Sequence, residues 1–200
     1  MKKILIGILI FTASCAHDLE NNPDAIWDEL ITLEQQNRME AERCHEAVEG
    51  WSETWSLMEE RVLEEVNVYR SQGADCRTEG SFSAADPLTM DARIRCSARY
   101  HSLWMGENDS FDHSSLGGDL GDDPFERMER TGFAGDPVGE NIAQGYETPN
   151  QVVAGWMTSD GHCANIMNPY ANVIGIGYFY QQPGSFGHLW TQNFGRIVGN

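Results

Sequence analysis

The chain has 200 residues, and its 31 Asp and Glu residues against 13 Lys and Arg residues give a formal net charge of -18. So acidic a chain repels phosphate backbones, which argues against nucleic acid as a partner. Its 40% of hydrophobic residues argues against wholesale disorder. Lys2 and Lys3 are the only lysines, so Schiff-base chemistry or a lysine general base is excluded from the chain that follows them.

Residues 1–14 are typical of an export signal peptide. Two lysines precede the apolar run ILIGILIF at residues 4–11, which is too short to span a bilayer. Small residues then lead to Cys15, an arrangement that resembles bacterial lipoproteins, in which this cysteine is acylated and becomes the mature N-terminus. We therefore expect residues 1–14 to be removed, Cys15 to be lipidated and residues 15–26 to form a tether. An ordinary secretory signal, with Cys15 free or in a disulfide, is the alternative.

The expected location is the bacterial cell envelope. Ala16 follows the cysteine, and by resemblance to Gram-negative lipoproteins this favours the outer membrane; a secreted protein is the alternative. A polyanion is not attracted to an anionic leaflet, so the lipid anchor alone would hold the protein at the membrane.

Four further cysteines predict two disulfide bonds, because disulfides form and persist in exported chains. They are Cys44, Cys76, Cys96 and Cys163. Three connectivities are open to four cysteines, and we favour Cys76–Cys163 with Cys44–Cys96.

The rest of the chain divides into an acidic helical extension, residues 27–55, and a domain, residues 56–198. His45 in the extension has no second ligand at helical spacing, and we interpret it as a solvated surface residue. In the domain, helical periodicity predicts a first helix that begins near Leu57 and ends at Gly73, and a second that begins at Asp91. His101 lies on the apolar stripe of the second helix, so we expect it to be buried and hydrogen-bonded.

Two later helix starts carry explicit capping signals. Asp123-Pro124-Phe125-Glu126 reads as a capping box, with Gly132 ending that helix, and Thr148-Pro149 precedes a second helix. Residues 173–180 and 188–195 then predict a β-hairpin. Helices followed by an antiparallel pair predict an α+β fold with helices laid on a small sheet.

Seven segments, in this order, resemble the CAP (SCP) domain family of secreted proteins, and in particular its bacterial branch. They are VNVYR (66–70), PLTMDARIRCSARYHSLWM (87–105), FDHSS (111–115), VGENIAQGY (138–146), VVAGWMTSDGHCANIMNP (152–169), IGIGYFY (174–180) and HLWTQNFG (188–195). The resemblance implies an α-β-α sandwich with a small antiparallel sheet flanked by helices.

The resemblance also implies a site. In this family a histidine after the second helix, a glutamate in GEN and a histidine in GH converge over a cavity, and here these are His113, Glu140 and His162. Eukaryotic members often add a glutamate three residues after a tryptophan, where this chain has Ser159. The complete set of two histidines and two glutamates is therefore absent, and Ser159 is the fourth cavity residue.

Two imidazoles and one carboxylate are the donors that an open zinc site needs, so zinc held by His113 and His162 is the one cofactor we consider. Purely structural roles are the alternative: His113 bonding within its loop, Glu140 satisfying backbone N–H groups, and His162 capping its helix.

The function we expect is a non-enzymatic binding module for an envelope or extracellular ligand, whether lipid, glycan or protein. Four aromatic residues could line the cleft, although a core position is the favoured interpretation for most of them: Trp156, Tyr178, Tyr180 and Trp190. The alternative is a metal-assisted hydrolase of peptide or cell-wall bonds with Glu140 as general base. A third interpretation is an acidic envelope protein with a vestigial cavity.

Overall fold

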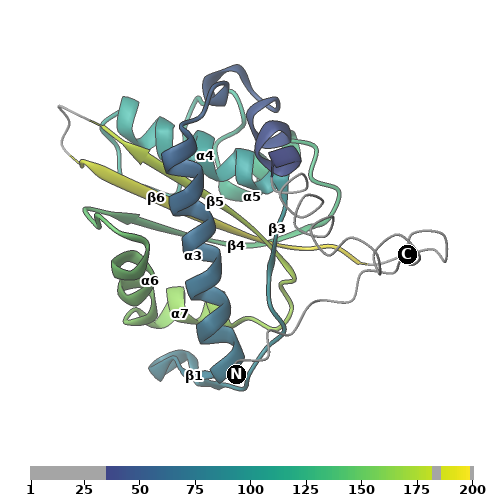
Figure 1. Ribbon diagram of the computed structural model, residues 1–200, viewed down its shortest axis with the longest axis vertical. Coiled ribbons are helices and arrows are strands. Elements are labelled where there is room, and N and C mark those ends of the chain that lie inside the picture. The colour runs from purple at the N-terminus through teal and green to yellow at the C-terminus, as the bar shows by residue number, and fades with distance from the viewer. Residues whose placement is uncertain (1–34, 182–185, 199–200) are drawn as a thin grey trace, which may run out of the picture. The chain divides into compact units, whose positions relative to one another are not determined.

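The computed structural model describes residues 35–181 and 186–198, and the fold below is that of the unit Asn37–Asn200 (Figure 1). The predicted export signal, Cys15, the predicted tether and residues 27–34 of the extension lie outside the described residues. Among those described, no helix is long and apolar enough to cross a membrane.

A four-stranded sheet forms the centre of this unit. Its strands are β3 (Thr89–Met90), β4 (Asp136–Gln144), β5 (Val173–Tyr180) and β6 (His188–Arg196), in the order β3-β5-β6-β4. The predicted hairpin is confirmed as β5 paired antiparallel with β6, and β4 is antiparallel to β6 on the other side. The short β3 runs parallel to β5, so the sheet is mixed, whereas the sequence predicted an antiparallel one.

One face of the sheet is covered by α4 (Ala92–Glu107), which lies directly on β5. Two glycines of β5 permit this close approach. A Cβ on Gly175 would lie 2.1 Å from the backbone carbon of Ile94, and one on Gly177 would lie 2.3 Å from that of Ala98. The short α5 (Pro124–Arg130) packs beside α4 and against β4.

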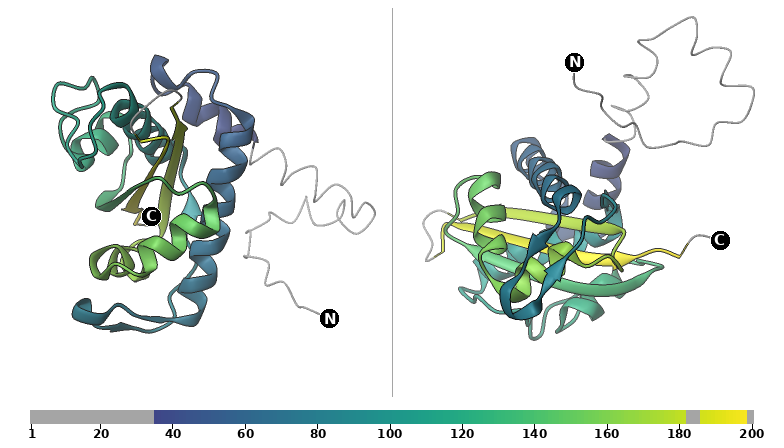
Figure 2. Two further views of the ribbon diagram at one scale, coloured as in Figure 1. Left: turned by 90° about the vertical axis from the view of Figure 1, so that its left-hand side faces the viewer. Right: turned by 90° about the horizontal axis from the view of Figure 1, so that it is seen from below.

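The opposite face is covered by α3 (Glu53–Gln72), α6 (Pro149–Met157) and α7 (Asp160–Met167). This is where the main hydrophobic core lies, and its buried members include Val62, Val66, Val153, Ile166, Ile174 and Ile176, together with Trp156, Tyr178 and Trp190. Helices on both faces of one sheet make the predicted α-β-α sandwich, which Figure 2 shows from two further directions. The core interpretation of these three aromatic residues is therefore confirmed, and Tyr180 is partly buried against the same core.

The two predicted capping residues, Asp123 and Thr148, are the N-caps of α5 and α6. Asp123 accepts hydrogen bonds from the backbone N–H groups of Phe125 and Glu126, and Thr148 accepts one from Gln151. The capping box is not closed at its second half, because Glu126 accepts from the N–H of Asp122 rather than from that of Asp123. The helix predicted near Leu57 begins earlier, at Glu53, and ends before Gly73, whose φ is 77°.

Both favoured disulfide pairings are confirmed, as Cys44–Cys96 and Cys76–Cys163. The second joins α7 to a small arm made of β1 (Ala74–Asp75), the 3-10 helix η2 (Arg77–Glu79) and β2 (Ser81–Phe82). Arg77 and Thr78 of this arm also bond the carboxylate of Asp160 at the start of α7. The arm and α7 are thus joined by a covalent bond and by an ion pair.

The extension is held against α4 by the other disulfide. It contains a helix that includes residues 37–42 and the 3-10 helix η1 (Glu46–Val48). His45 precedes η1, accepts the N–H of Ala47 through Nδ1, and places its ring 4.9 Å from that of Tyr100. Its side chain is only 16% exposed, so the solvated-surface interpretation of His45 was wrong: the ring caps a helix and packs on α4.

Candidate functional site

Glu140 lies on the edge strand β4, opposite Asn193 of β6. The segment carries polar residues at buried positions, because Glu140 and Asn141 are both buried. This is why the sequence, which lacks a clean alternation there, did not predict a strand. The Glu140 side chain is 1% exposed, and so burying a charge here requires partners on both oxygens.

Both carboxylate oxygens of Glu140 have such partners. His113 donates from Nδ1 to Oε1 at 2.8 Å, and Arg127 donates from Nη2 to Oε2 at 2.8 Å. The Asn193 amide, in the orientation that satisfies all of its neighbours, places its nitrogen 2.9 Å from Oε2. Nε2 of the buried His101 lies 3.8 Å from Oε1. The carboxylate is therefore enclosed by donors.

Arg127 organises the loop as well as the carboxylate. Its side chain is fully buried on α5. Nη2 also donates to the backbone oxygen of His113 at 2.9 Å, and Nη1 donates to Oγ of Ser115 at 2.6 Å. Ser115 in turn donates to the backbone oxygen of Gly121 at 2.7 Å. One guanidinium thus connects β4 to the loop that carries His113.

The electrostatics follow from these contacts. The hydrogen bond from His113 to Glu140 raises the pKa of that imidazole above its usual value. Burial by itself would raise the pKa of Glu140, but His101, the His113 bond and the Arg127 guanidinium outweigh it and hold this pKa below its usual value. Burial lowers the pKa of His101 to about 4. Glu140 is therefore ionised at neutral pH, and His101 is neutral.

His101 confirms the prediction of a buried, hydrogen-bonded histidine. It is 0% exposed, and Nε2 lies 3.0 Å from the backbone oxygen of Asp112. Because a carbonyl oxygen can only accept, Nε2 carries the proton in the neutral ring. Asp112 directly precedes His113, so His101 supports the same loop that Arg127 holds.

His162 lies on α7 and is half-buried. Burial lowers its pKa, and the charge of His113 lowers it further, so the two imidazoles lie within electrostatic reach of each other. α7 is bonded to β4 through Asn165, which donates to the backbone oxygen of Glu140 at 3.3 Å, and through the oxygen of His162, which accepts from Asn141 at 3.2 Å.

Ser159 is the N-cap residue of α7, and its side chain makes no capping hydrogen bond. His113, by contrast, is reached from solvent, since half of its side chain is exposed. The structure thus joins His113 directly to Glu140, places His162 nearby, and gives Ser159 no bond to any of the three among the described residues.

The donor set does not fit the zinc site that the family resemblance implies. Open zinc sites in proteins use three protein ligands and leave one position for water. The part of the chain that the structure describes contains no group of three or more His, Cys, Asp or Glu side chains that could hold a metal ion. Glu140 is bonded to a guanidinium instead. Zinc held by His113 and His162 alone stays a prediction.

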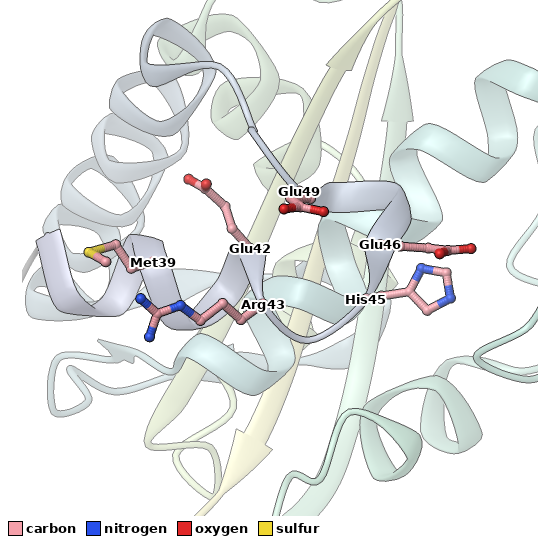
Figure 3. A pocket seen from close by; sticks show the side chains of 6 residues that line it. All are labelled: Met39, Glu42, Arg43, His45, Glu46 and Glu49. Atoms are coloured by element: carbon pink, nitrogen blue, oxygen red, sulfur yellow. The ribbon is translucent and has the colours of Figure 1, made fainter.

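Pockets of the described surface lie around the extension and near α6. One of about 450 Å³ is lined by Met39, Glu42, Arg43, His45, Glu46 and Glu49. Figure 3 shows Met39 and Arg43 at one end of it and His45 and Glu46 at the other. A second, of about 430 Å³, shares His45 and Glu46 and continues onto Tyr100 and Trp104 of α4. Neither of these two pockets includes His113, Glu140 or His162.

Sequence reasoning missed Arg127 and Asn193 as site residues. An arginine in a short helix is ordinarily a surface residue, and nothing in the segment DPFERMER (123–130) shows that Arg127 rather than Arg130 is buried. A signal did exist for Asn193. Three polar residues in succession, Thr191, Gln192 and Asn193, occupy the middle of an otherwise apolar strand, and buried polar residues of this kind need partners.

The chain is similar in sequence to a family model and to known proteins. The model of the cysteine-rich secretory protein family (CAP) matches residues 63–194. The protein YkwD of Bacillus subtilis is 36% identical over 139 residues, which are 70% of this chain and 47% of that protein. The membrane protein YlbC of Bacillus subtilis is 29% identical over 147 residues, which are 73% of this chain and 36% of that protein. The chain thus spans less than half the length of these curated relatives.

Two solved structures share the fold. An extracellular protein containing an SCP domain, from Bacillus anthracis, superposes with a TM-score of 0.55 at 26% identity, covering 69% of this chain and 40% of that one. An outer surface protein of Borrelia burgdorferi gives a TM-score of 0.56 at 19% identity, covering 70% of this chain and 92% of that one. The second likeness shows the fold alone.

Proposed function

The chain belongs to the cysteine-rich secretory protein (CAP) family, and from this premise we propose that it is an exported, lipid-anchored binding module. Its ligand is a component of the envelope or of the extracellular space, whether lipid, glycan or protein. The ligand binds at the site formed by His113, Glu140 and His162, and it is not chemically converted there.

One observation carries this proposal: the Glu140 carboxylate is engaged on both oxygens and closed to solvent. A general base needs an accessible oxygen and a pKa near the working pH. Glu140 has a 1% exposed side chain and a lowered pKa. Its position suits orientation of His113 rather than proton abstraction. The hydrolase alternative, which relies on Glu140 as base, has no comparable support.

The accessible part of the site supports recognition of a ligand with both polar and apolar groups. Because His113 donates from Nδ1 to Glu140, its Nε2 is left for a partner outside the protein. Two apolar residues within three positions of His113 in the sequence are exposed, Phe111 at 37% and Leu116 at 76%. Exposed apolar groups next to fixed polar groups are typical of binding surfaces.

The extracellular protein from Bacillus anthracis, which is 26% identical, supports a location outside the cytoplasm. The anchor is tested by metabolic labelling with palmitate. We expect labelling of the wild type and none of Cys15→Ser, since the thiol is the acylated atom. Equal labelling of the two proteins would contradict the lipid anchor.

Binding is tested with three probes: peptidoglycan sacculi, phospholipid vesicles and solubilised envelope proteins immobilised on a sensor. We expect saturable binding to one of them. His113→Ala and His162→Ala should weaken it, whereas His45→Ala, a histidine change outside the site, should not. Glu140→Gln removes the countercharge of Arg127 and should lower stability, but the protein that circular dichroism shows to be folded should keep binding, because an amide oxygen still accepts from His113. Binding no stronger than that of an unrelated protein of equal charge would contradict the proposal.

The same sacculi separate the proposal from the hydrolase alternative. The wild type should release no soluble fragments, with or without added zinc. Release that depends on Glu140, and is lost in Glu140→Gln, would establish the hydrolase instead.

A further inference from the structure

The site contains its own cation. Arg127 is 0% exposed and donates to Oε2 of Glu140 at 2.8 Å. We propose that this buried guanidinium permanently takes the place that a divalent metal ion would need at Glu140, so that Arg127 makes the site a metal-independent one. The inference concerns the same site as the proposed function, but it does not depend on which ligand binds there.

The first argument is access to the carboxylate. For Glu140 to be the third ligand of a metal shared with His113 and His162, one of its oxygens must face that metal. Oε2 is taken by Arg127 and by the Asn193 amide, and Oε1 is taken by Nδ1 of His113. A metal ion could reach this carboxylate only by displacing one of these partners.

The second argument is charge. Arg127 carries a positive charge, and a divalent cation brought to the same buried carboxylate would be repelled by that charge in a medium of low dielectric. Asp112 is the other acidic group that acts on His113. Asp112 is exposed, and so is the His113 side chain. Water therefore screens the effect of the Asp112 charge on His113.

The third argument is that Arg127 cannot move away without cost. Its Nη1 is bonded to Ser115 and its Nη2 to the backbone oxygen of His113. A buried arginine that loses its carboxylate leaves an uncompensated charge, which is strongly destabilising. Metal binding to Glu140 would therefore have to oppose the bonds that hold the His113 loop in place.

The experiment is zinc titration of the exported protein by calorimetry, comparing the wild type with Arg127→Gln, Arg127→Lys and Arg130→Gln. We expect Arg127→Gln to bind one zinc ion at least about tenfold more tightly than the wild type, because it removes the charge and one of the two partners of Oε2. Arg127→Lys keeps the charge and should gain less. Arg130→Gln removes an equal charge from the exposed side of the same helix and should leave zinc affinity near that of the wild type.

Two controls assign the result to the site. Adding His113→Ala to Arg127→Gln should abolish the gain, which separates the site from zinc bound by the acidic surface. Circular dichroism reports whether each variant folds. A folded Arg127→Gln protein with no gain in zinc affinity overturns the inference.

The wild type keeps the inference testable even if Arg127→Gln does not fold. One equivalent of zinc bound tightly by the wild type, and lost in both His113→Ala and Glu140→Gln, overturns it; only weak zinc binding supports it. Because zinc alone is the probe, these results stand apart from the search for the envelope ligand. Failure to bind sacculi, vesicles or envelope proteins would remove the proposed function and leave the role of Arg127 unchanged.

Discussion

Glu59 of α3 is fully buried and is bonded by two arginines of α4. Arg95 donates from Nε to Oε2 at 2.9 Å, and Arg99 donates from Nη2 to the same oxygen at 2.7 Å. The other oxygen accepts from the indole N–H of Trp51 at 2.9 Å and from the backbone N–H of Tyr178 at 3.2 Å. A single carboxylate therefore connects the extension, α3, α4 and β5.

Replacing Glu59 by Gln should destabilise the protein by about 3–5 kcal/mol, because it leaves two buried arginines without their countercharge. Urea unfolding followed by tryptophan fluorescence measures this change. Glu64→Gln is the matched control: Glu64 is 63% exposed and paired with Arg61, and surface pairs contribute only about 0–1 kcal/mol. Equal losses in the two variants would show that the buried network adds nothing to stability.

The lowered pKa of His101 should make the folded protein less stable at low pH. This pKa is lowered from 6.5 to about 4, so between these values the unfolded chain binds more protons than the folded one. Stability should therefore fall by about 3 kcal/mol as the pH falls through this range. His113 acts in the opposite direction: its raised pKa gives a contribution that is present below the usual histidine pKa and lost as the pH rises through the folded value.

His101→Gln isolates the first of these effects. Glutamine can still donate to the backbone oxygen of Asp112, but it does not titrate. We expect its free energy of unfolding to fall less than that of the wild type between pH 6.5 and pH 4.5. Denaturant titrations at a series of pH values measure the two curves, and parallel curves would contradict the assignment to His101.

At the residue scale, the sequence predicted well where periodicity applies and poorly where partners are distant. His101 was predicted to be buried because it falls on a helical stripe. Arg127 was not predicted, because its acceptors, Glu140 and the loop oxygens, are brought to it only by the folded chain. Glu59, Arg95 and Arg99 were missed for the same reason.

At the element scale, the contact of α4 with β5 depends on two glycines. The Cβ of Gly175→Ala would overlap the backbone of α4, at 2.1 Å from a carbon that cannot move independently. We expect the free energy of unfolding to fall by about 1–3 kcal/mol or more, since α4 must shift away from the sheet. Gly161→Ala in α7 is the control, because a Cβ there meets nothing within 4 Å.

The control variant Gly161→Ala should itself change stability in a known direction. Alanine is favoured over glycine in a helix by about 1 kcal/mol, so Gly161→Ala should leave stability unchanged or raise it. Thermal unfolding of both variants under one buffer measures the difference. A Gly175→Ala protein as stable as the wild type would mean that α4 does not press on β5 as described.

Helices with explicit caps were predicted with the right start, because Asp123 and Thr148 act through local bonds that the sequence displays. The sheet was harder. β4 was missed since polar residues are buried along it, and β3 was missed since two residues give no periodicity. The parallel pairing of β3 with β5 depends on the crossover through α4, α5, β4, α6 and α7, which no local pattern encodes.

At the scale of the whole molecule, the disulfides join parts that are far apart in the sequence. Cys76 and Cys163 are separated by 87 residues, and both are fully buried. Replacing both by Ala should lower stability by about 2–5 kcal/mol, chiefly because the unfolded chain regains freedom. Urea unfolding under oxidising conditions measures this. After full reduction of the disulfides, the variant and the wild type should differ much less in their free energy of unfolding. A difference as large as under oxidising conditions would argue against the bond.

The order of strands in the sheet has a consequence for how the chain acquires its fold. β5 and β6 occupy the middle of the sheet, yet among the described residues they are the last two strands, while the earlier β3 and β4 each pair there with just one of them. During synthesis, β3 and β4 are therefore made before the two strands with which they pair, which lie in the last fifth or so of the domain. A product that ends before Val173 would retain helices and the small β1-β2 arm but not the four-stranded sheet, so we expect proteases to degrade it.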